Sequence, residues 1–255
     1  MTASLRLIRR ILETEAAFCL ARLEHLDALA GNALGLAWRQ LDAGAIAQMA
    51  RHRPGPAYNR LLGLRADLLA EIAPVLAWYE DAGVKAEVET VAAYTDPNLV
   101  GELVRRGYFQ SGFRVMLAGR PRLPRPGPHR AVQKITSAAR LEEVCAPSAD
   151  AELQAQCRAA FGAAGSALYL SATEGLTTAA VVLFRQEGIG FCAPAPLSPA
   201  CQGLHIAPFT AALADAAAAG LAWVCVEADL ASAAQRSLLG LGLTVAFVRA
   251  LWTPL

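Results

Sequence analysis

The chain has 255 residues, of which 55% are hydrophobic, so it can bury a sizeable core in one large domain or two small ones. Its 23 basic and 22 acidic residues give a net charge of +1, which argues against a nucleic-acid binder with a concentrated basic face. No apolar run reaches the roughly 18 residues of a membrane span, and residues 1–18 lack the continuous apolar stretch of a secretory signal. We therefore expect a cytoplasmic protein without a nucleic-acid or membrane partner.

The first half of the chain predicts an alternation of helices and strands. Apolar residues recur at spacings of three and four through the first 30 residues, which is typical of a helix, and Ser4 suits its N-cap. The turn signal Asp42-Ala43-Gly44 separates two short strands. Asp96 and Pro97 predict the start of a later helix. The expected order is helix 1–30, strands 32–41, 45–52 and 57–64, helix 65–83, strand 84–94, helix 96–107 and strand 108–119.

A run rich in proline and arginine, residues 120–130, can neither pair in a sheet nor continue a helix, so it predicts a linker. The order of elements then begins again. We expect strand 131–136, helical residues 138–162, strands 167–173, 177–186 and 188–197, helix 205–220, strand 221–230, helix 232–242 and strand 243–252.

Both halves end in the order strand, helix, strand, helix, strand. Gly83 and Gly220 close the first of these helices, and Gly107 and Gly242 close the second. A repeat of this length indicates a duplicated domain. The expected fold is therefore α/β (α+β), with two tandem modules that each form a mixed, mostly antiparallel sheet flanked by helices. The boundaries are residues 1–119, a linker at 120–128, and residues 129–255.

One strand–loop–helix unit in the second half has the properties of an anion site. Pro199 bars the strand from continuing beyond Leu197. The turn consists of Gln202, Gly203 and Leu204, and a helix starts at or just after His205. The first N–H groups of that helix have no partner within it, and the helix dipole adds partial positive charge. Most turns of this kind bind only water, so the signal is general.

Residues 197–207 resemble the cofactor loop of the GNAT superfamily of acyl-CoA-dependent N-acyltransferases, whose pattern is V-x-P-x-x-[RQ]-G-x-G-x-[GA]. Pro199, Gln202, Gly203 and Ala207 match this pattern, Leu197 is a conservative fit, and His205 departs from it. The helix with Ser232, Gln235, Arg236, Leu238 and Gly242 resembles the last helix of two-module members. The similarity in element order extends over nearly the whole chain as two tandem modules.

This resemblance implies a site for acetyl-CoA or another acyl-CoA in the second module, with the pyrophosphate on the loop N–H groups and the thioester where two strands splay apart. The first module has no such loop and is expected not to bind the cofactor. The implied cofactor-binding residues are Ala195, Leu197, Gln202, Gly203, Leu204, His205, Ile206, Ala207, Gln235 and Arg236.

His205 leaves two outcomes open. Glycine at this position lets phosphate approach the backbone, and a side chain crowds it. Either the imidazole swings outward and binding survives, or it fills the site and the module binds no CoA.

The resemblance implies a general base, often Glu, and a tyrosine acid in the last helix. Leu238 stands at the tyrosine position, so that acid is absent. Glu227 and Asp229, near the expected splay, are candidates for the base, and Asp229 equally suits a helix N-cap. Tyr58 and Asn59 are candidates for a substrate groove between the modules.

Metal binding is not expected. The six cysteines include no C-x-x-C pair and the four histidines form no ligand pair, so we expect free thiols, with Cys225 in the core.

The function expected from the resemblance is an N-acyltransferase acting on an amine, either a small molecule or a protein amino group, in a monomer or homodimer. The alternative is a non-catalytic protein with this fold that binds a ligand or partner through a degenerate CoA site.

Overall fold

The computed structural model describes residues 4–30, 32, 34–56, 58–122, 132–145, 155, 158–159, 161–162, 165–173, 176–194 and 206–255, and everything below concerns these residues. In the first half they form α1 (Leu5–Ala30), β1 (Leu36–Asp42), β2 (Ala45–Ala50), β3 (Arg60–Leu64), the short helix η1 (Ala66–Leu68), α2 (Leu69–Asp81), β4 (Glu87–Val91), η2 (Ala92–Tyr94), α3 (Pro97–Arg105) and β5 (Tyr108–Gly119).

The second half repeats this pattern. Its elements are β6 (Val132–Ile135), α4 (Ala138–Cys145), β7 (Ala167–Thr173), β8 (Leu176–Gln186), β9 (Ile189–Pro194), α6 (Ile206–Ala218), β10 (Trp223–Asp229), α7 (Ala233–Gly240) and β11 (Thr244–Pro254). The four glycines predicted to close helices, Gly83, Gly107, Gly220 and Gly242, all have positive φ between 67° and 90°. The predicted α/β class with two modules is confirmed.

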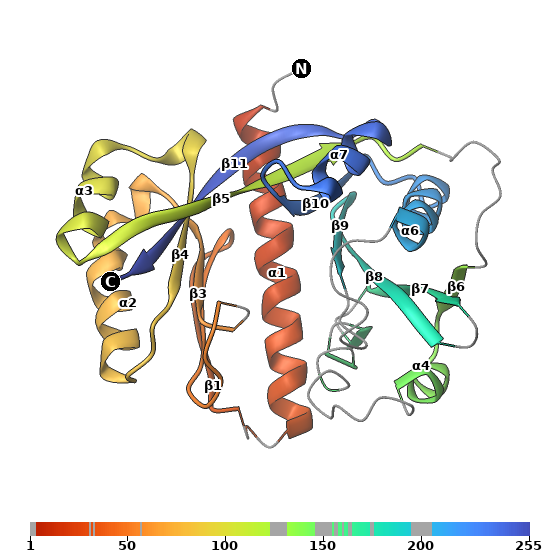
Figure 1. The fold of residues 1–255 in the computed structure, drawn as a ribbon, viewed down its shortest axis with the longest axis horizontal. Coiled ribbons are helices and arrows are strands. Elements are labelled where there is room, and N and C mark those ends of the chain that lie inside the picture. The colour runs from red at the N-terminus through yellow and green to blue at the C-terminus, as the bar shows by residue number, and fades with distance from the viewer. Residues whose placement is uncertain are drawn as a thin grey trace.

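The two modules share one sheet, in the order β1-β2-β3-β4-β11-β5-β10-β9-β8-β7-β6. The sequence predicted a sheet for each module, but the modules exchange their last strands. β11 lies between β4 and β5, and β5 pairs with β10, so the long strands β5 and β11 cross the centre of the molecule (Figure 1). Among the pairings described, only β3–β4 and β9–β10 are parallel.

Helices cover both faces of the sheet. α1 lies across the middle of one face, where its buried side chains pack against residues from both modules (Figure 1). On the opposite face, α2 and α3 pack against the first module, and α6 and α7 pack against the second. Successive side chains of a strand point to opposite faces of the sheet, so each strand contributes to the cores on both faces. On β4, Val91 packs in the core under α1 and Val88 packs in the core under α2.

Local signals account for several element boundaries. The Ser4 hydroxyl accepts a hydrogen bond from the Leu7 N–H at 3.2 Å, and Asp96 caps α3 by accepting from the Leu99 N–H at 2.8 Å, both as predicted. The strand expected over residues 57–64 begins only at Arg60. Before it, the Asn59 side-chain amide donates to the carbonyl oxygens of Arg53 and Gly55, so Asn59 closes a turn.

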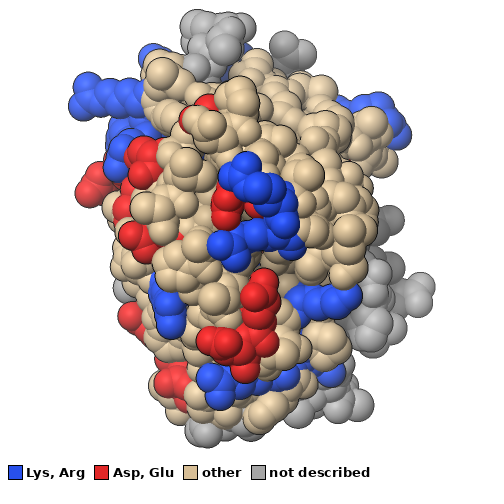
Figure 2. Space-filling view, turned by 90° about the vertical axis from the view of Figure 1, so that its left-hand side faces the viewer, with Lys and Arg blue, Asp and Glu red and all other residues tan. Residues whose placement is uncertain are grey.

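At the surface of the first module, charges of both signs are interspersed. Figure 2 shows acidic and basic side chains side by side on this end of the molecule. On α3, for example, Glu102 accepts hydrogen bonds from Arg105 and Arg106, each at 2.7 Å. No helix among the described residues is long and apolar enough to cross a membrane.

Candidate functional site

The parallel strands β9 and β10 separate at their C-terminal ends. Their pairing runs from Trp223 opposite Ile189 to Val226 opposite Cys192 and then stops. Beyond this point β9 pairs only with β8, and β10 pairs only with β5 as far as Asp229. We call the place past Cys192 and Val226, where the two strands no longer pair, the wedge. It leaves the main chain of Ala193 and Pro194 without a strand partner on the β10 side.

The corresponding place in the first module is closed. Leu61 of β3 pairs with Val88 of β4, a bulge follows, and pairing resumes at Leu64 opposite Thr90. The bulge contains Gly63, with φ of +70° and no room for a side chain, because a Cβ there would lie 2.0 Å from the carbonyl oxygen of Gly44. The bulge therefore keeps β3 and β4 together where β9 and β10 part.

The strand register relates one glutamate in each module. Arg114 of β5 lies directly opposite Arg249 of β11, so the halves are related about this pair. On one side Arg114 faces Asp229, and on the other Arg249 faces Val91. Two residues earlier on each strand stand Glu227 of β10 and Glu89 of β4, which are therefore equivalent positions.

Charged side chains surround Arg114 and Arg249 on the α1 side of the sheet. We call them the junction cluster: Glu15, Arg60, Glu87, Glu89, Arg114, Glu227, Asp229 and Arg249.

Arg249 is the centre of the cluster and is completely buried. Its Nη1 donates to Glu227 Oε1 at 2.8 Å, to Glu15 Oε1 at 2.8 Å and to Glu89 Oε2 at 3.0 Å. Its Nη2 donates to the second oxygen of Glu15. A buried arginine is tolerated only when carboxylates satisfy it, and these three come from α1 and two different modules.

The two equivalent glutamates differ in exposure and in protonation. The Glu89 side chain is sealed, and although burial favours its neutral acid, Arg60, Arg249 and Arg114 outweigh burial and lower its pKa. The Glu227 side chain is 22% exposed, and it follows directly after Val226, the last residue of β10 that pairs with β9. Burial raises its pKa to about 7 against the pull of Arg249, and the negative charges of Glu89 and Glu15 add to the rise.

The predicted cofactor loop is only partly described. Ala195, Leu197, Gln202, Gly203, Leu204 and His205 lie outside the described residues. Ile206 and Ala207 are half-buried at the start of α6, so this helix begins where the sequence predicted. The first module differs here as well, because only Arg65 separates β3 from η1, and its buried guanidinium pairs with Asp42 and Asp67.

Gln235 and Arg236 lie on α7, just beyond the wedge. The Ala231 N–H donates to Gln235 Oε1 at 2.6 Å, and Arg236 Nη1 donates to the Ala231 carbonyl at 2.8 Å. Both side chains therefore fix the turn that follows β10, where Ala231 has a positive φ of 62°. The N-cap of α7 is Ser232, not Asp229, because the Gln235 N–H donates to the Ser232 hydroxyl at 3.1 Å.

The remaining sequence candidates have these surroundings. Asp229 is 80% exposed and lies 3.7 Å from Arg114 Nε. Tyr58 is buried in the core beneath α1. Asn59 is also buried, and its amide bonds the backbone of residues 50, 53 and 55. Neither Tyr58 nor Asn59 has a side chain at the surface in this conformation. Cys225 is in the core as predicted, and burial raises its thiol pKa.

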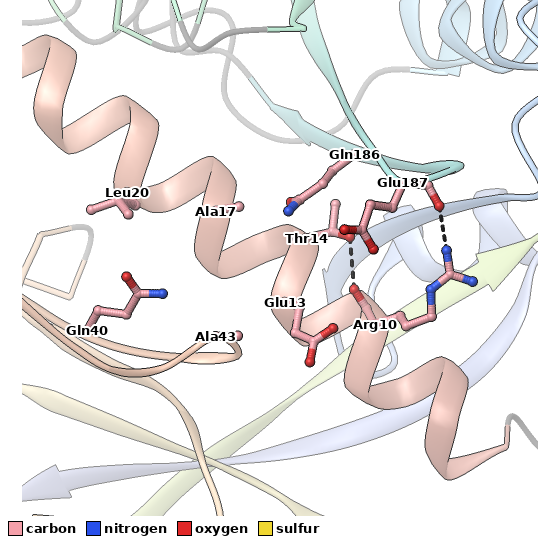
Figure 3. A pocket seen from close by; sticks show the side chains of 9 residues that line it. All are labelled: Arg10, Glu13, Thr14, Ala17, Leu20, Gln40, Ala43, Gln186 and Glu187. Atoms are coloured by element: carbon pink, nitrogen blue, oxygen red, sulfur yellow. Dashed lines mark hydrogen bonds between the residues drawn. The ribbon is translucent and has the colours of Figure 1, made fainter.

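A separate cavity of about 290 Å³ lies on the side of α1 that faces away from the junction cluster (Figure 3). Its floor is the outward stripe of the helix, including Glu13 and Ala17, and its walls are the β1–β2 hairpin and the β8–β9 turn. Glu15 points the opposite way, toward Arg249. The body of α1 thus separates this cavity from the junction cluster.

Of the junction cluster, only Glu227 and Asp229 were candidates from the sequence. One signal was present: Arg249 interrupts the apolar run 245–252, and Glu89 sits between two valines and a threonine. A charge at an inward strand position needs a buried partner. The partners come from a helix and strands that are distant in the chain, so the signal predicts a buried partner but does not identify it.

No protein-family profile and no curated protein matches the chain. Several solved structures are similar in fold. A GCN5-related N-acetyltransferase from Kribbella flavida is 14% identical, with a TM-score of 0.53 over 82% of this chain and 86% of that one. A conserved protein of unknown function from Staphylococcus epidermidis ATCC 12228 is 11% identical, with a TM-score of 0.55 over 87% of this chain and 94% of that one.

A third similar structure is described as a tandem GNAT protein from the clavulanic acid biosynthesis pathway. It is 12% identical, with a TM-score of 0.53 over 86% of this chain and 82% of that one. At these identities the likeness concerns the fold. Together with the two-module topology and the parting of β9 and β10, it shows that the chain has the fold of the GCN5-related N-acetyltransferases, with two modules in tandem.

Proposed function

We propose that the protein is an acyl-CoA-dependent N-acyltransferase whose second module carries the reaction. The observation behind this is the wedge, with a half-buried glutamate next to it and the start of α6 beyond it. The first module lacks both a wedge and a loop of comparable length. One acyl-CoA per chain is therefore the expected stoichiometry.

The wedge suits the acyl-CoA because it offers unpaired main chain. Beyond Cys192 the described β9 backbone, Ala193 and Pro194, has no partner from β10. Pro194 has no N–H, so the main-chain groups available to the amides of the pantetheine arm are the two carbonyls and the Ala193 N–H. The N-terminus of α6, together with the preceding loop, is the expected place for the pyrophosphate. The acceptor is an amine, from a small molecule or a protein.

Glu227 is the proposed general base. The amine nitrogen attacks the thioester carbonyl carbon, the carbon–sulfur bond breaks, and CoA leaves as a thiolate. The amine loses a proton, which Glu227 accepts directly or through a water molecule. A carboxylate with a pKa of about 7 is well matched to this task near neutral pH, whereas one at its ordinary value is a weaker base. The rate is therefore expected to rise with pH through about 7.

The test combines binding with transfer. Binding of acetyl-CoA is measured by thermal unfolding, and transfer is measured as CoA release with a panel of primary amines and peptides. We expect a raised melting temperature together with amine-dependent CoA release. A complete lack of response to acetyl-CoA and to longer acyl-CoAs would overturn the proposal.

The second candidate, a non-catalytic binding protein, is favoured by one observation: His205 stands where the GNAT loop has glycine. A His205→Gly variant separates the two candidates. If the wild-type protein binds no acyl-CoA and the variant does, the histidine blocks the site and the wild-type protein is not an acyltransferase. If both bind, the imidazole turns away from the phosphate.

A further inference from the structure

Glu227 uses its two carboxylate oxygens differently. Oε1 accepts a hydrogen bond from Arg249 Nη1 at 2.8 Å, whereas Oε2 has no hydrogen bond to any residue that the structure describes. Arg249 is fully buried and Glu227 is partly exposed at the wedge. One oxygen is thus fixed on the inside, and the other is free to take part in chemistry.

Arg249 is itself held by groups outside the second module. It lies on β11, which is inserted between β4 and β5 of the first module. Glu89 of β4 and Glu15 of α1 bind the same guanidinium that binds Glu227. The side chain that orients the candidate base of one module is therefore anchored by the other module and by the helix between them.

We propose that Arg249 is the positioning residue for Glu227, and that Glu15 and Glu89 determine how strongly the Arg249 charge acts on it. The inference rests on the proposed function in assigning Glu227 the role of base. It gives the closed first module a role in the chemistry of the second.

A buried guanidinium 2.8 Å from a carboxylate strongly favours the ionised form and makes it a poor base. Two sealed carboxylates on the same guanidinium offset that charge. Arg249 then holds Glu227 in place while Glu227 still accepts a proton near neutral pH, in agreement with its raised pKa.

Other groups also face Glu227. Arg60 of β3 lowers its pKa, as Arg249 does, while Glu89 and Glu15 raise it. Arg114 of β5 binds Glu89 at 3.0 Å and lies 3.7 Å from Asp229. Cys225 lies two residues before Glu227 on β10, and burial raises its pKa, so it is neutral near pH 7. Glu15 and Glu89 are thus the two carboxylates that bind Arg249 together with Glu227.

The experiment measures the Glu227 pKa directly, by carbon-13 NMR titration of the full chain labelled at glutamate side chains, with Glu227→Gln assigning the signal. Glu89→Gln and Glu15→Gln each remove one offsetting charge, so each is expected to lower the Glu227 pKa by about one unit. Glu89→Asp keeps the charge and is expected to keep the pKa near that of the wild type. Glu102→Gln, on the surface of α3, is the matched control and leaves it unchanged.

The second readout is the pH dependence of kcat/KM for acyl transfer, whose acid limb follows the same pKa. A Glu227 that titrates near its ordinary value in the wild-type protein, or a pKa that Glu89→Gln and Glu15→Gln leave where Glu102→Gln leaves it, overturns the inference. Circular dichroism identifies any variant that does not fold, and the wild-type titration then decides alone.

Failure of the inference is distinguishable from failure of the proposed function. If the pKa shifts as expected but no amine is acylated, the coupling through Arg249 stands and the acyltransferase proposal fails. If acyl transfer occurs with a pKa that does not respond to Glu89 and Glu15, the enzyme proposal stands and the coupling fails.

Discussion

The two modules carry a glutamate at the same register position, and their surroundings differ. Glu89 in the first module is sealed among Arg60, Arg114 and Arg249 and has a lowered pKa. Glu227 in the second module keeps one hydrogen bond to Arg249, lies at the wedge and has a pKa raised to about 7. The same residue type is a structural counter-ion in one place and a candidate base in the other.

The difference arises from the neighbouring parallel strand. After equivalent pairs, Leu61–Val88 and Cys192–Val226, the first module inserts a bulge and resumes pairing, whereas the second lets its strands part. The bulge that contains Gly63 thus restores in the first module the pairing that is lost in the second. Each prediction below tests whether the modules differ at this point and agree elsewhere.

The largest effect is expected for Glu227→Gln. Removing a general base lowers the rate by about 10²- to 10⁴-fold, so kcat for acyl transfer is expected to fall by that factor while acyl-CoA still binds. Steady-state kinetics with Glu102→Gln as the control measures this. A Glu227→Gln enzyme as active as the control would remove the functional contrast between Glu227 and Glu89.

The bulge that closes the first module is tested by Gly63→Ala. The substitution places a Cβ 2.0 Å from the Gly44 carbonyl oxygen, at a φ of +70°. We expect a loss of at least about 2 kcal/mol in the free energy of unfolding, measured with urea. Gly188→Ala is the control, because that glycine also has positive φ but its Cβ meets nothing within 4 Å. Equal losses for the two variants would contradict the close packing of the bulge.

The contrast in cofactor binding is tested by stoichiometry. Acetyl-CoA at a hundred times its dissociation constant adds about 2.7 kcal/mol to stability, which corresponds to a rise in melting temperature of about 5 to 11 °C. Isothermal titration calorimetry is expected to give one site per chain. Two sites would show that the first module binds as well, despite its paired strands.

The smallest effect concerns helix caps, where the modules agree. Asp96 caps α3 and Ser232 caps α7, each through a hydrogen bond to the N–H three residues later. Asp96→Ala and Ser232→Ala are each expected to cost about 1 kcal/mol of stability. Thermal unfolding of the two variants checks this, and a loss confined to one of them would show that the modules differ outside the wedge too.

Most of the element order could be predicted because its signals are local. The apolar stripe of α1, the caps at Ser4 and Asp96 and the four terminal glycines each act within a few residues. The exchange of β5 and β11 could not be predicted. Both strands are apolar enough to pair with either β4 or β10, and the choice depends on packing across the whole sheet.

The candidate site was predicted only in part. The position of Glu227 near the splay followed from the resemblance. The hydrogen bonds of Arg249 could not be predicted, because they join it to Glu227, 22 positions away, and to Glu15, 234 positions away. The bulge had a local signal, since a glycine inside the strand 57–64 indicates a bulge or a close backbone approach. Its effect on strand pairing depends on the partner strand β4.

The position of β11 between β4 and β5 also determines when the sheet of the first module can be completed during synthesis. Until residues 244–254 leave the ribosome, β4 has a free edge, because its neighbours in the finished sheet are β3 and β11. Roughly 150 residues separate β4 from β11. At a synthesis rate of about 5–20 residues per second, this edge of β4 therefore stays unpaired for about 8 to 30 s. A free strand edge invites pairing with other chains. We therefore expect the nascent first module to be the stage at which pairing with another chain competes most with folding.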